Sequence, residues 1–393
     1  MTTIAPTAFE ANTFTINGSV LSWSQLEPPF SVSSFPHPYS VSIIEAIADY
    51  QQIIATADFV IIDQNIAHIY GIGERRAGTT FLVIPSEENK TLDTVSAIID
   101  QMIDLEISKG SKVVAIGGGI VQDLSACACA LFRRGQPFTY MPTTTLGQLD
   151  SCVGAKCAVN TAKAKNILGL FSAPSEVFIP IFLIKTMPLL DHRAGLAEML
   201  RLCLTASISA VQIYSNLLPS IAQPSTLDLS AYAEAVSVSL SIKKSVVDFD
   251  EYERDVRRSM NYGHTFGHAI EKLSNYQVPH GLGVLLGMHI ANVYSTAIGV
   301  MAPSCLAELT IIFQKTALEI RLPFFQASDL VPEKIISQFR YDKKGDGASV
   351  PLILIERPGM MIFRQYLFSQ SHEVLSQSIR LGIDEFSAWI NQP

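Results

Sequence analysis

The feature that most constrains the fold is an alternation of strand-like and helix-like segments between about residues 41 and 185. The strand-like segments are short apolar runs, rich in β-branched or aromatic residues, at 57–63, 111–119, 137–143 and 175–181. The segments with helical periodicity lie at 41–54 and 91–108. Strands that alternate with helices predict a parallel α/β sheet covered by helices.

The pattern changes after about residue 185, where long helical segments such as 231–250 and 280–299 dominate. A chain of 393 residues is also too long for one compact core. We therefore predict two domains, an α/β domain over residues 1–185 and a mostly α-helical domain over residues 186–393. Residues 1–40 are polar and rich in Pro and Ser, and we interpret part of them as a flexible lead-in to the first domain.

Composition excludes several classes of function. Hydrophobic residues make up 48% of the chain and charged residues 16%, which indicates a well-buried globular protein. With a net charge of −8 and no run of Lys or Arg, a nucleic-acid-binding face is not expected. No signal peptide or membrane span is predicted, and cysteines without a C-x-x-C pair fit a reducing, cytoplasmic setting. Basic residues that matter should therefore contact a small anionic molecule.

Two stretches of the first half carry candidate ligand-binding groups. In VVAIGGGIVQDLSA, residues 113–126, an apolar strand runs into Gly117, Gly118 and Gly119, and a helix follows. Glycines at a helix N-terminus suit a phosphate or nucleotide, although a tight turn explains them equally well. In PTTTLGQLDSCVGAKCAVNTAKAKNILG, three lysines without matching acids favour an anionic ligand over an ordinary solvated loop.

The second half contains candidate metal ligands. The stretch NYGHTFGHAIE places His264 and His268 four residues apart, on one face of a helix. They could share a metal ion, or they could have separate roles. Glu198 interrupts the apolar helical stretch AGLAEMLR, and His280 follows a proline turn. Glu198 with two of the three histidines would form the His2Glu set of a catalytic zinc site.

Taken together, these stretches resemble the dehydroquinate synthase family of sugar phosphate cyclases over roughly residues 55 to 360. The motifs that carry the resemblance, in order, are GGGIVQDLSACACALFRRG, MPTTTLGQLDSCVGAKCAVN, KNILGLF, AGLAEMLR, NYGHTFGHAIE and HGLGVLLGM. The resemblance implies a Rossmann-like NAD-binding domain, a helical metal- and substrate-binding domain, one divalent metal (zinc or cobalt) and a homodimer.

The resemblance also implies roles for individual residues. The implied metal ligands are Glu198, His264 and His280, and the implied catalytic residues are Lys156, His268, Asp150 and Asn261. The implied substrate-binding residues are Arg134, Asn166, Arg201, Lys243, Arg257 and Lys343 or Lys344, with Arg134 reaching the substrate phosphate across the dimer interface. The implied NAD-binding residues are Asp63, Glu87, Lys90, Gly118, Gly119, Asp123, Thr143, Thr144, Lys165 and Thr186.

The reaction that the resemblance implies converts a seven-carbon keto-acid sugar phosphate (DAHP) to 3-dehydroquinate and phosphate. Transient oxidation by NAD acidifies a neighbouring C–H, phosphate leaves by β-elimination, the hydride returns, and an intramolecular aldol step closes the ring. Retention of Lys243 and Arg257, the positions that match carboxylate contacts, favours a carboxylated substrate.

Two departures from the family pattern leave more than one function open. Arg201 stands where the family has a lysine, and Leu282 stands where it has a glutamate beside a metal ligand. A specialised paralogue could cyclise sedoheptulose 7-phosphate or amino-DAHP instead. The sequence is also compatible with a metal-dependent polyol or glycerol-phosphate dehydrogenase and with a non-catalytic binding homologue.

Overall fold

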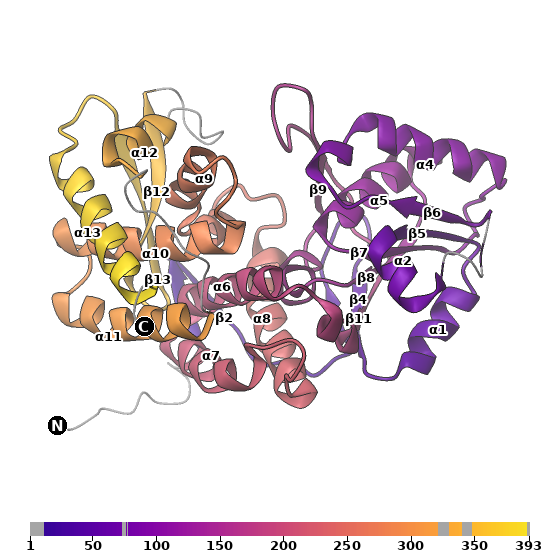
Figure 1. Ribbon diagram of the computed structural model, residues 1–393, viewed down its shortest axis with the longest axis horizontal. Coiled ribbons are helices and arrows are strands. Elements are labelled where there is room, and N and C mark those ends of the chain that lie inside the picture. The colour runs from indigo at the N-terminus through magenta and orange to yellow at the C-terminus, as the bar shows by residue number, and fades with distance from the viewer. Residues whose placement is uncertain (1–11, 73–75, 77, 321–329, 340–347, 391–393) are drawn as a thin grey trace. The chain divides into compact units, whose positions relative to one another are not determined.

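A computed structural model describes residues 12–72, 76, 78–320, 330–339 and 348–390 (Figure 1). The chain forms two compact units. One consists of Leu26–Met187, and the other combines Pro188–Pro393 with Met1–Gln25. Among the described residues, none of the helices combines the length and the apolar character needed to cross a membrane.

The unit Leu26–Met187 is built on a seven-stranded sheet with the order β3-β4-β11-β8-β7-β5-β6. Its strands are β3 (Phe30–Val32), β4 (Tyr39–Ile44), β5 (Phe59–Asp63), β6 (Thr80–Val83), β7 (Val113–Gly117), β8 (Phe138–Pro142) and β11 (Glu176–Pro180). All neighbouring pairs are parallel except β3 with β4, which are antiparallel. The four strand-like segments of the sequence are therefore confirmed, as is the parallel sheet.

Helices cover both faces of this sheet. Figure 1 shows α4 (Leu92–Asp104) and α5 (Gly119–Leu131) on one side, and α1 (Ile47–Ala55) and α2 (Gln64–Tyr70) on the other. The strand residues Val60 and Ile62 belong to the core beneath α1 and α2. Because successive side chains of a strand point to opposite faces, Phe59 and Ile61, which are also fully buried, face α4 and α5. Strands buried on both faces explain the uninterrupted apolar runs of the sequence.

One expected helix in this unit is wrong in its first half. Residues 41–44 are part of strand β4, and α1 begins only at Ile47. The β-branched residues Val41 and Ile44 are buried, and β4 pairs with β11 along its length. Sheet pairing with a distant strand thus overrides a periodicity that also fits a helix.

The second unit is mostly α-helical, as expected. Its long helices are α6 (Leu189–Ala206), α7 (Ile208–Ile221), α8 (Leu229–Phe249), α10 (His280–Ala297), α11 (Pro303–Ile320) and α13 (Glu373–Ile390). Shorter helical segments are η5 (Val256–Asn261), α9 (His264–Leu273) and α12 (Pro332–Gln338). The helices expected at 231–250 and 280–299 correspond to α8 and α10.

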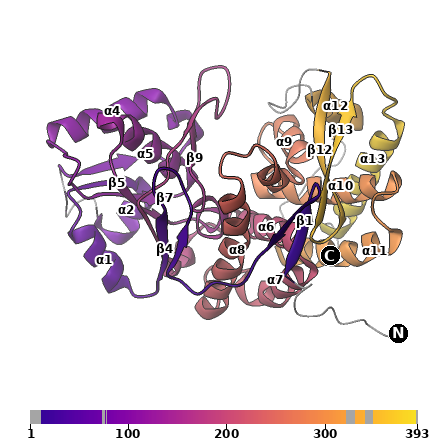
Figure 2. The same cartoon turned by 180° about the vertical axis from the view of Figure 1, so that it is seen from behind.

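A four-stranded sheet in this unit corrects the expected assignment of the N-terminal segment. The sheet has the order β12-β13-β1-β2, formed by β1 (Thr13–Ile16), β2 (Ser19–Ser22), β12 (Ser349–Arg357) and β13 (Met360–Leu367). Figure 2 shows β1, in indigo, beside the yellow and orange strands of the other end of the chain. The described residues before Leu26 therefore belong to the helical unit and not to the first domain, which the sequence predicts over residues 1–185.

Glycines let three helices of this unit approach closely. A Cβ atom at Gly287 of α10 would lie 2.1 Å from the carbonyl oxygen of Gly263, which precedes α9. A Cβ atom at Gly267 of α9 would lie 2.9 Å from the backbone of Gly283. At the start of α10, a Cβ atom at Gly281 would lie 2.0 Å from the carbonyl oxygen of Ala194 in α6. Backbone contact at these points brings α6, α9 and α10 together.

Candidate functional site

The three closely packed helices bring four candidate side chains together. Glu198 comes from the middle of α6, where it is 2% exposed. His264 begins α9 and His268 follows one turn later, and His280 begins α10. The three histidines each offer a ring nitrogen, and these nitrogens all lie within 4.8 Å of one another. The structure therefore groups the three implied metal ligands, and His268 lies beside them.

The carboxylate of Glu198 fits a metal ion shared with two of the histidines. Its Oε1 atom lies 3.7 Å from Nε2 of His264 and 3.4 Å from Nε2 of His280. Ligands about 2 Å from a tetrahedral ion are separated by roughly 3.3 Å, close to these distances. Oε1 is buried and has no hydrogen-bond partner among the described residues. A buried oxygen without a partner is costly, and a cation between it and the histidines would satisfy it.

Arg201, one helical turn after Glu198, holds the other carboxylate oxygen. Its Nε atom donates to Oε2 of Glu198 at 2.5 Å, and one guanidinium nitrogen lies 3.3 Å from Sδ of Met260. The side chain of Arg201 is 1% exposed. The family resemblance implies a substrate-binding role for Arg201, but the structure directs its guanidinium to Glu198. The two oxygens of Glu198 are thus divided between the guanidinium and the histidine side.

The electrostatics of the site favour a cation at His280. Burial by itself lowers the pKa of His280, but its hydrogen bond to Glu271 and the charges of Glu198 and Glu271 together raise that pKa. Leu282, which stands where the family has a glutamate, is buried in the packed face of α10. The carboxylate beside His280 is instead Glu271 of α9, whose Oε1 accepts a hydrogen bond from Nδ1 at 2.9 Å.

Further site residues of this unit lie on α8 and on η5, which packs against both α6 and α8. Lys243 of α8 is 8% exposed and Arg257 of η5 is 4% exposed. The carboxylate of Asp250 accepts from the backbone amide of Arg257 at 3.1 Å, and Arg257 donates to the carbonyl oxygen of Glu251. Such bonds fix the segment that carries Arg257, so its charge has a defined position.

The same segment positions Asn261. Its side-chain amide donates to a carboxylate oxygen of Glu253 and, at 3.1 Å, to the carbonyl oxygen of Arg258. Lys343 and Lys344 lie outside the described residues.

In the α/β unit, three of the implied NAD-binding residues, Asp63, Gly118 and Gly119, lie where the strand order reverses. From β5 the chain passes to β6 on one side, then returns to β7 on the other side and continues to β8. Asp63 ends β5, and Gly117 ends the adjacent strand β7. Ligands of open α/β sheets bind at the carboxyl ends of the strands at such a reversal.

The turn after β7 leaves room for a ligand. Gly118 precedes α5, and Gly119 is its first residue. A Cβ atom at Gly118 would lie 2.7 Å from the Thr144 side chain, whereas one at Gly119 would have no heavy atom within 4 Å. Open space at a helix N-terminus fits a phosphate. Burial raises the pKa of Asp63, while hydrogen bonds from two backbone amides partly oppose it. The open helix N-terminus and the carboxylate at the end of the neighbouring strand fit the phosphate and the ribose of a dinucleotide.

Two more of the implied cofactor residues, Thr143 and Thr186, lie after strands β8 and β11. Thr143 follows β8, and its amide donates to the carbonyl oxygen of Gly117 at 3.0 Å. Thr186 ends the short helix η4 (Ile181–Thr186), and its hydroxyl donates to the carbonyl oxygen of Leu183 at 2.9 Å. These bonds hold the loops at the carboxyl ends of the strands.

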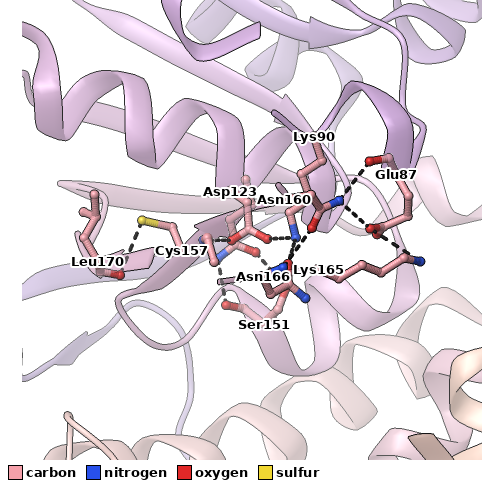
Figure 3. A network of polar contacts seen from close by, with 11 residues as sticks. Glu87, Lys90, Asp123, Ser151, Cys157, Asn160, Lys165, Asn166 and Leu170 are labelled. Carbon is pink, nitrogen blue, oxygen red and sulfur yellow. Dashed lines mark hydrogen bonds and ion pairs between the residues drawn. The ribbon is translucent and has the colours of Figure 1, made fainter. Parts of the chain in front are cut away.

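A polar network connects four of the implied cofactor residues with an implied substrate residue (Figure 3). The ammonium of Lys90, which is 5% exposed, lies 2.5 Å from Asp123 and donates to the side-chain oxygen of Asn166 at 2.6 Å. Lys165 lies 3.7 Å from the carboxylate of Glu87 at the edge of the network. Asn166, which has a left-handed backbone, is thereby tied to α5 through Lys90.

Replacing Lys90 by methionine should destabilise the protein by about 3 kcal/mol, because a mostly buried carboxylate loses its cation. Burial, the largest effect, already raises the pKa of Asp123 despite the ammonium of Lys90. Loss of Lys90 raises that pKa further. The deficit should therefore be largest at neutral pH and should shrink as the pH falls through this pKa and Asp123 takes up a proton.

Chemical denaturation of the variant across a pH series measures this effect. Lys244→Met is the matched control, because Lys244 pairs with Asp248 on the more exposed face of α8 and such a pair contributes at most about 0.5 kcal/mol. Equal destabilisation by the two substitutions would contradict the structural role of the Lys90–Asp123 pair.

The other implied residues of this unit are placed by short local elements. Asp150 is buried in η3 (Gly147–Ser151), and reciprocal bonds between the side chain of Gln122 and Ser151 hold that segment to α5. Lys156 begins strand β9 (Lys156–Val159) and is exposed. Arg134 is exposed at the end of η2 (Phe132–Arg134).

Sequence reasoning missed two residues that the structure brings into these sites. Glu271 is three residues after His268 and seven after His264, so helical spacing alone would have placed it on the same face. Asn160 accepts from the amide of Asn166 at 2.8 Å and donates to the carboxylate of Glu87 at 2.9 Å. No local pattern distinguishes Asn160, because its contact with Glu87 joins segments 73 residues apart.

Comparisons with known proteins match most of the chain. The profile described as 3-dehydroquinate synthase N-terminal matches residues 80–194, and the profile described as 3-dehydroquinate synthase C-terminal matches residues 195–345. A 3-dehydroquinate synthase of Dehalococcoides mccartyi is 33% identical over 307 residues, which cover 76% of this chain and 83% of the relative. A 3-dehydroquinate synthase of Desulforamulus reducens is 32% identical over 355 residues, covering 88% of this chain and 97% of the relative.

Solved structures with the same fold include two synthases. A 2-deoxy-scyllo-inosose synthase complexed with carbaglucose-6-phosphate, NAD+ and Co2+ has a TM-score of 0.75 and 21% identity, covering 90% of this chain and 99% of that one. A 2-epi-5-epi-valiolone synthase from Streptomyces hygroscopicus with NAD+ and Zn2+ bound has a TM-score of 0.75 and 20% identity, with the same coverage. Because the sequence identities are only 20–21%, these two similarities show that the fold is shared and nothing more.

Proposed function

The chain belongs to the 3-dehydroquinate synthase family, and from this premise we propose that it converts DAHP to 3-dehydroquinate and phosphate with NAD and one divalent metal ion. Relatives named as 3-dehydroquinate synthases match 76–88% of the chain at 32–33% identity. The structural observation that carries the proposal is the buried Oε1 of Glu198, which lies 3.7 Å from Nε2 of His264 and 3.4 Å from Nε2 of His280.

Glu198, His264 and His280 would hold the metal ion, and the turn after β7 with Asp63 would hold NAD. When bound, these two groups supply hydride transfer and stabilisation of the negative charge that develops on the substrate's hydroxyl oxygen. His268 is exposed beside the three ligands and would face the substrate instead. A side chain with a ring nitrogen in that position can exchange a proton with the substrate's phosphate end.

Buried positive charge supports a carboxylated substrate. Lys243 and Arg257 are both more than nine-tenths buried, although the chain has a net charge of −8. The backbone amide of Arg257 donates to Asp250 and its guanidinium donates to the carbonyl oxygen of Glu251. These two bonds fix the position of its charge before the substrate binds. A preorganised guanidinium and an ammonium suit a carboxylate. Cyclases whose substrates lack a carboxylate have no need of such a pair.

We propose that Arg201 does not bind the substrate directly but acts by positioning the carboxylate of Glu198. Its guanidinium donates to Oε2 of that carboxylate and leaves Oε1 for the metal ion. For Asp150, Lys156, Asn166 and Asn261 we propose the catalytic or substrate-binding roles that the family resemblance implies.

Arg134, which is exposed, would reach the phosphate of a second copy's substrate in a homodimer. The cytoplasmic location inferred from the cysteines stays a prediction.

The full chain should release phosphate from DAHP when NAD and Zn2+ or Co2+ are supplied. Sedoheptulose 7-phosphate and amino-DAHP are tested beside it under the same conditions. Because the hydride returns to the substrate, NADH should not accumulate as product forms, and its absorbance should stay constant. We expect phosphate release to be faster with DAHP than with sedoheptulose 7-phosphate, since only a carboxylated substrate can use Lys243 and Arg257. Amino-DAHP also carries a carboxylate, so its rate tests whether the site accepts an amino group in place of a hydroxyl.

The substrate panel separates the candidate activities. Faster release from sedoheptulose 7-phosphate or amino-DAHP would replace the DAHP assignment by that of a specialised paralogue. NADH accumulating in step with product would identify a dehydrogenase. Inactivity on all three substrates with either metal would contradict the cyclase proposal.

A further inference from the structure

The carboxylate of Glu271 contacts a proposed metal ligand but has no part in the proposed chemistry. Glu271 lies in the last turn of α9, and its Oε1 atom is 2.9 Å from Nδ1 of His280. Its side chain is 14% exposed. An ionised carboxylate can only accept, so Nδ1 must carry the proton of this hydrogen bond. The free electron pair of the neutral ring is then on Nε2, which lies 3.4 Å from Oε1 of Glu198.

The packing of α9 on α10 seats this carboxylate. A Cβ atom at Gly283 of α10 would lie 3.3 Å from Cγ of Glu271, 3.4 Å from its Oε1 and 3.1 Å from the carbonyl oxygen of Gly267. The glycine therefore lets the Glu271 side chain lie against the backbone of α10, one turn from His280. The contact is built by the helix crossing and does not depend on a flexible surface side chain.

The two proposed histidine ligands differ in what orients them. Nδ1 of His264 lies 3.3 Å from the carbonyl oxygen of Tyr262, a weak and neutral partner. Nδ1 of His280 has a charged partner at a shorter distance. Because a carboxylate on the far nitrogen fixes the ring and increases the basicity of the ligating nitrogen, the metal affinity of His280 should depend on Glu271.

We propose that Glu271 is a positioning residue that holds His280 with Nε2 directed at the metal ion. This proposal rests on the proposed metal site of Glu198, His264 and His280. Glu271 touches neither the substrate nor the ion. It acts by selecting one tautomer and one ring orientation of His280, and its removal should weaken metal binding.

The test measures Co2+ affinity of the full chain by competition with a chelating dye, together with the visible spectrum of bound Co2+. Glu271→Gln keeps the size of the side chain and removes its charge, and we expect it to weaken Co2+ binding by about 10–100-fold. The absorption bands of bound Co2+ should also change, because the orientation of one ligand changes. Glu271→Asp, which retains the charge, should recover part of the affinity.

Glu385→Gln is a matched control. Glu385 of α13 accepts from Nε2 of His289 at 2.7 Å, and His289 lies on the same helix as His280. The control removes an equivalent carboxylate from a histidine of α10 outside the metal site, and it should leave Co2+ affinity unchanged. Thermal unfolding of both metal-free variants shows whether each retains the wild-type fold.

The outcomes distinguish this proposal from the metal site itself. Tight Co2+ binding by Glu271→Gln, within about twofold of the wild type, would overturn the role of Glu271 and leave the metal site intact. Equal weakening by Glu385→Gln would also overturn it, because the effect would then be general to α10. If the wild type bound no Co2+, the metal site and the role of Glu271 would fail together.

Discussion

Replacing His264 by alanine should abolish tight metal binding, whereas replacing His268 by alanine should leave it nearly intact. His264 presents Nε2 at 3.7 Å from a buried carboxylate oxygen of Glu198 that has no hydrogen-bond partner among the described residues. His268 is exposed, although its ring lies 5.3 Å from that of His264. The loss of a direct ligand should weaken binding by more than the roughly 100-fold that an outer partner contributes.

Metal content after dialysis and phosphate release separate the two roles. Both variants should lose turnover, His268→Ala by about 10²–10⁴-fold if it transfers a proton. Only His264→Ala should emerge without metal. If both variants lose metal equally, His264 and His268 share the ion, as their spacing on one helical face allows. A His268→Ala protein with wild-type turnover would remove His268 from the catalytic residues.

Gly287→Ala should lower the free energy of unfolding by about 3 kcal/mol, which is at the upper end of the range for overpacked interiors. The added Cβ atom would lie 2.1 Å from the carbonyl oxygen of Gly263 and 2.9 Å from the amide nitrogen of Gly267. Both are backbone atoms that cannot rotate away, so α9 and α10 must separate. Because His264 and His280 belong to these two helices, metal affinity should fall along with stability.

Denaturation and Co2+ titration of the same preparation measure both effects. Gly110→Ala is the control, because a Cβ atom there would have the hydroxyl of Ser108, 4.0 Å away, as its nearest neighbour. It should leave both quantities within experimental error. Unchanged stability in Gly287→Ala would show that the helices can separate without cost and would contradict the packing argument.

Much of the fold could be predicted because a strand that is buried on both faces is evident from its own residues. The run FVIID indicates a strand without any knowledge of its neighbours. Strand β1 could not be found in this way. Thr15 and Ile16 pair with Met360 and Met361, more than three hundred residues later, and nothing in the polar N-terminal segment indicates that partner. The helix predicted over residues 41–54 is wrong at residues 41–44 for a related reason, since sheet pairing with β11 decides the structure of those residues.

In the candidate site, too, some features follow from the sequence and others only from the packing of distant segments. The spacing of His264 and His268 predicts one shared helical face, and the motifs identify Glu198 and His280 as further candidates. Spacing cannot show which oxygen of Glu198 stays without a partner, since Arg201 takes the other one only when the side chains are packed. The family resemblance implies that Arg201 binds the substrate, because the contact between Arg201 and Glu198 cannot be seen in the sequence.

By itself, the sequence determined the alternating and helical halves of the chain, the candidate residues and the family whose motifs they form. Those properties follow from residue types and spacings within single segments. Only the tertiary structure decided that β1 and β2 join the second unit, that Arg201 contacts Glu198, and that Glu271 contacts His280. The physical reason is that these contacts depend on how closely separate helices and strands approach, and backbone contact at Gly281, Gly283 and Gly287 sets that distance for the helices of the metal site.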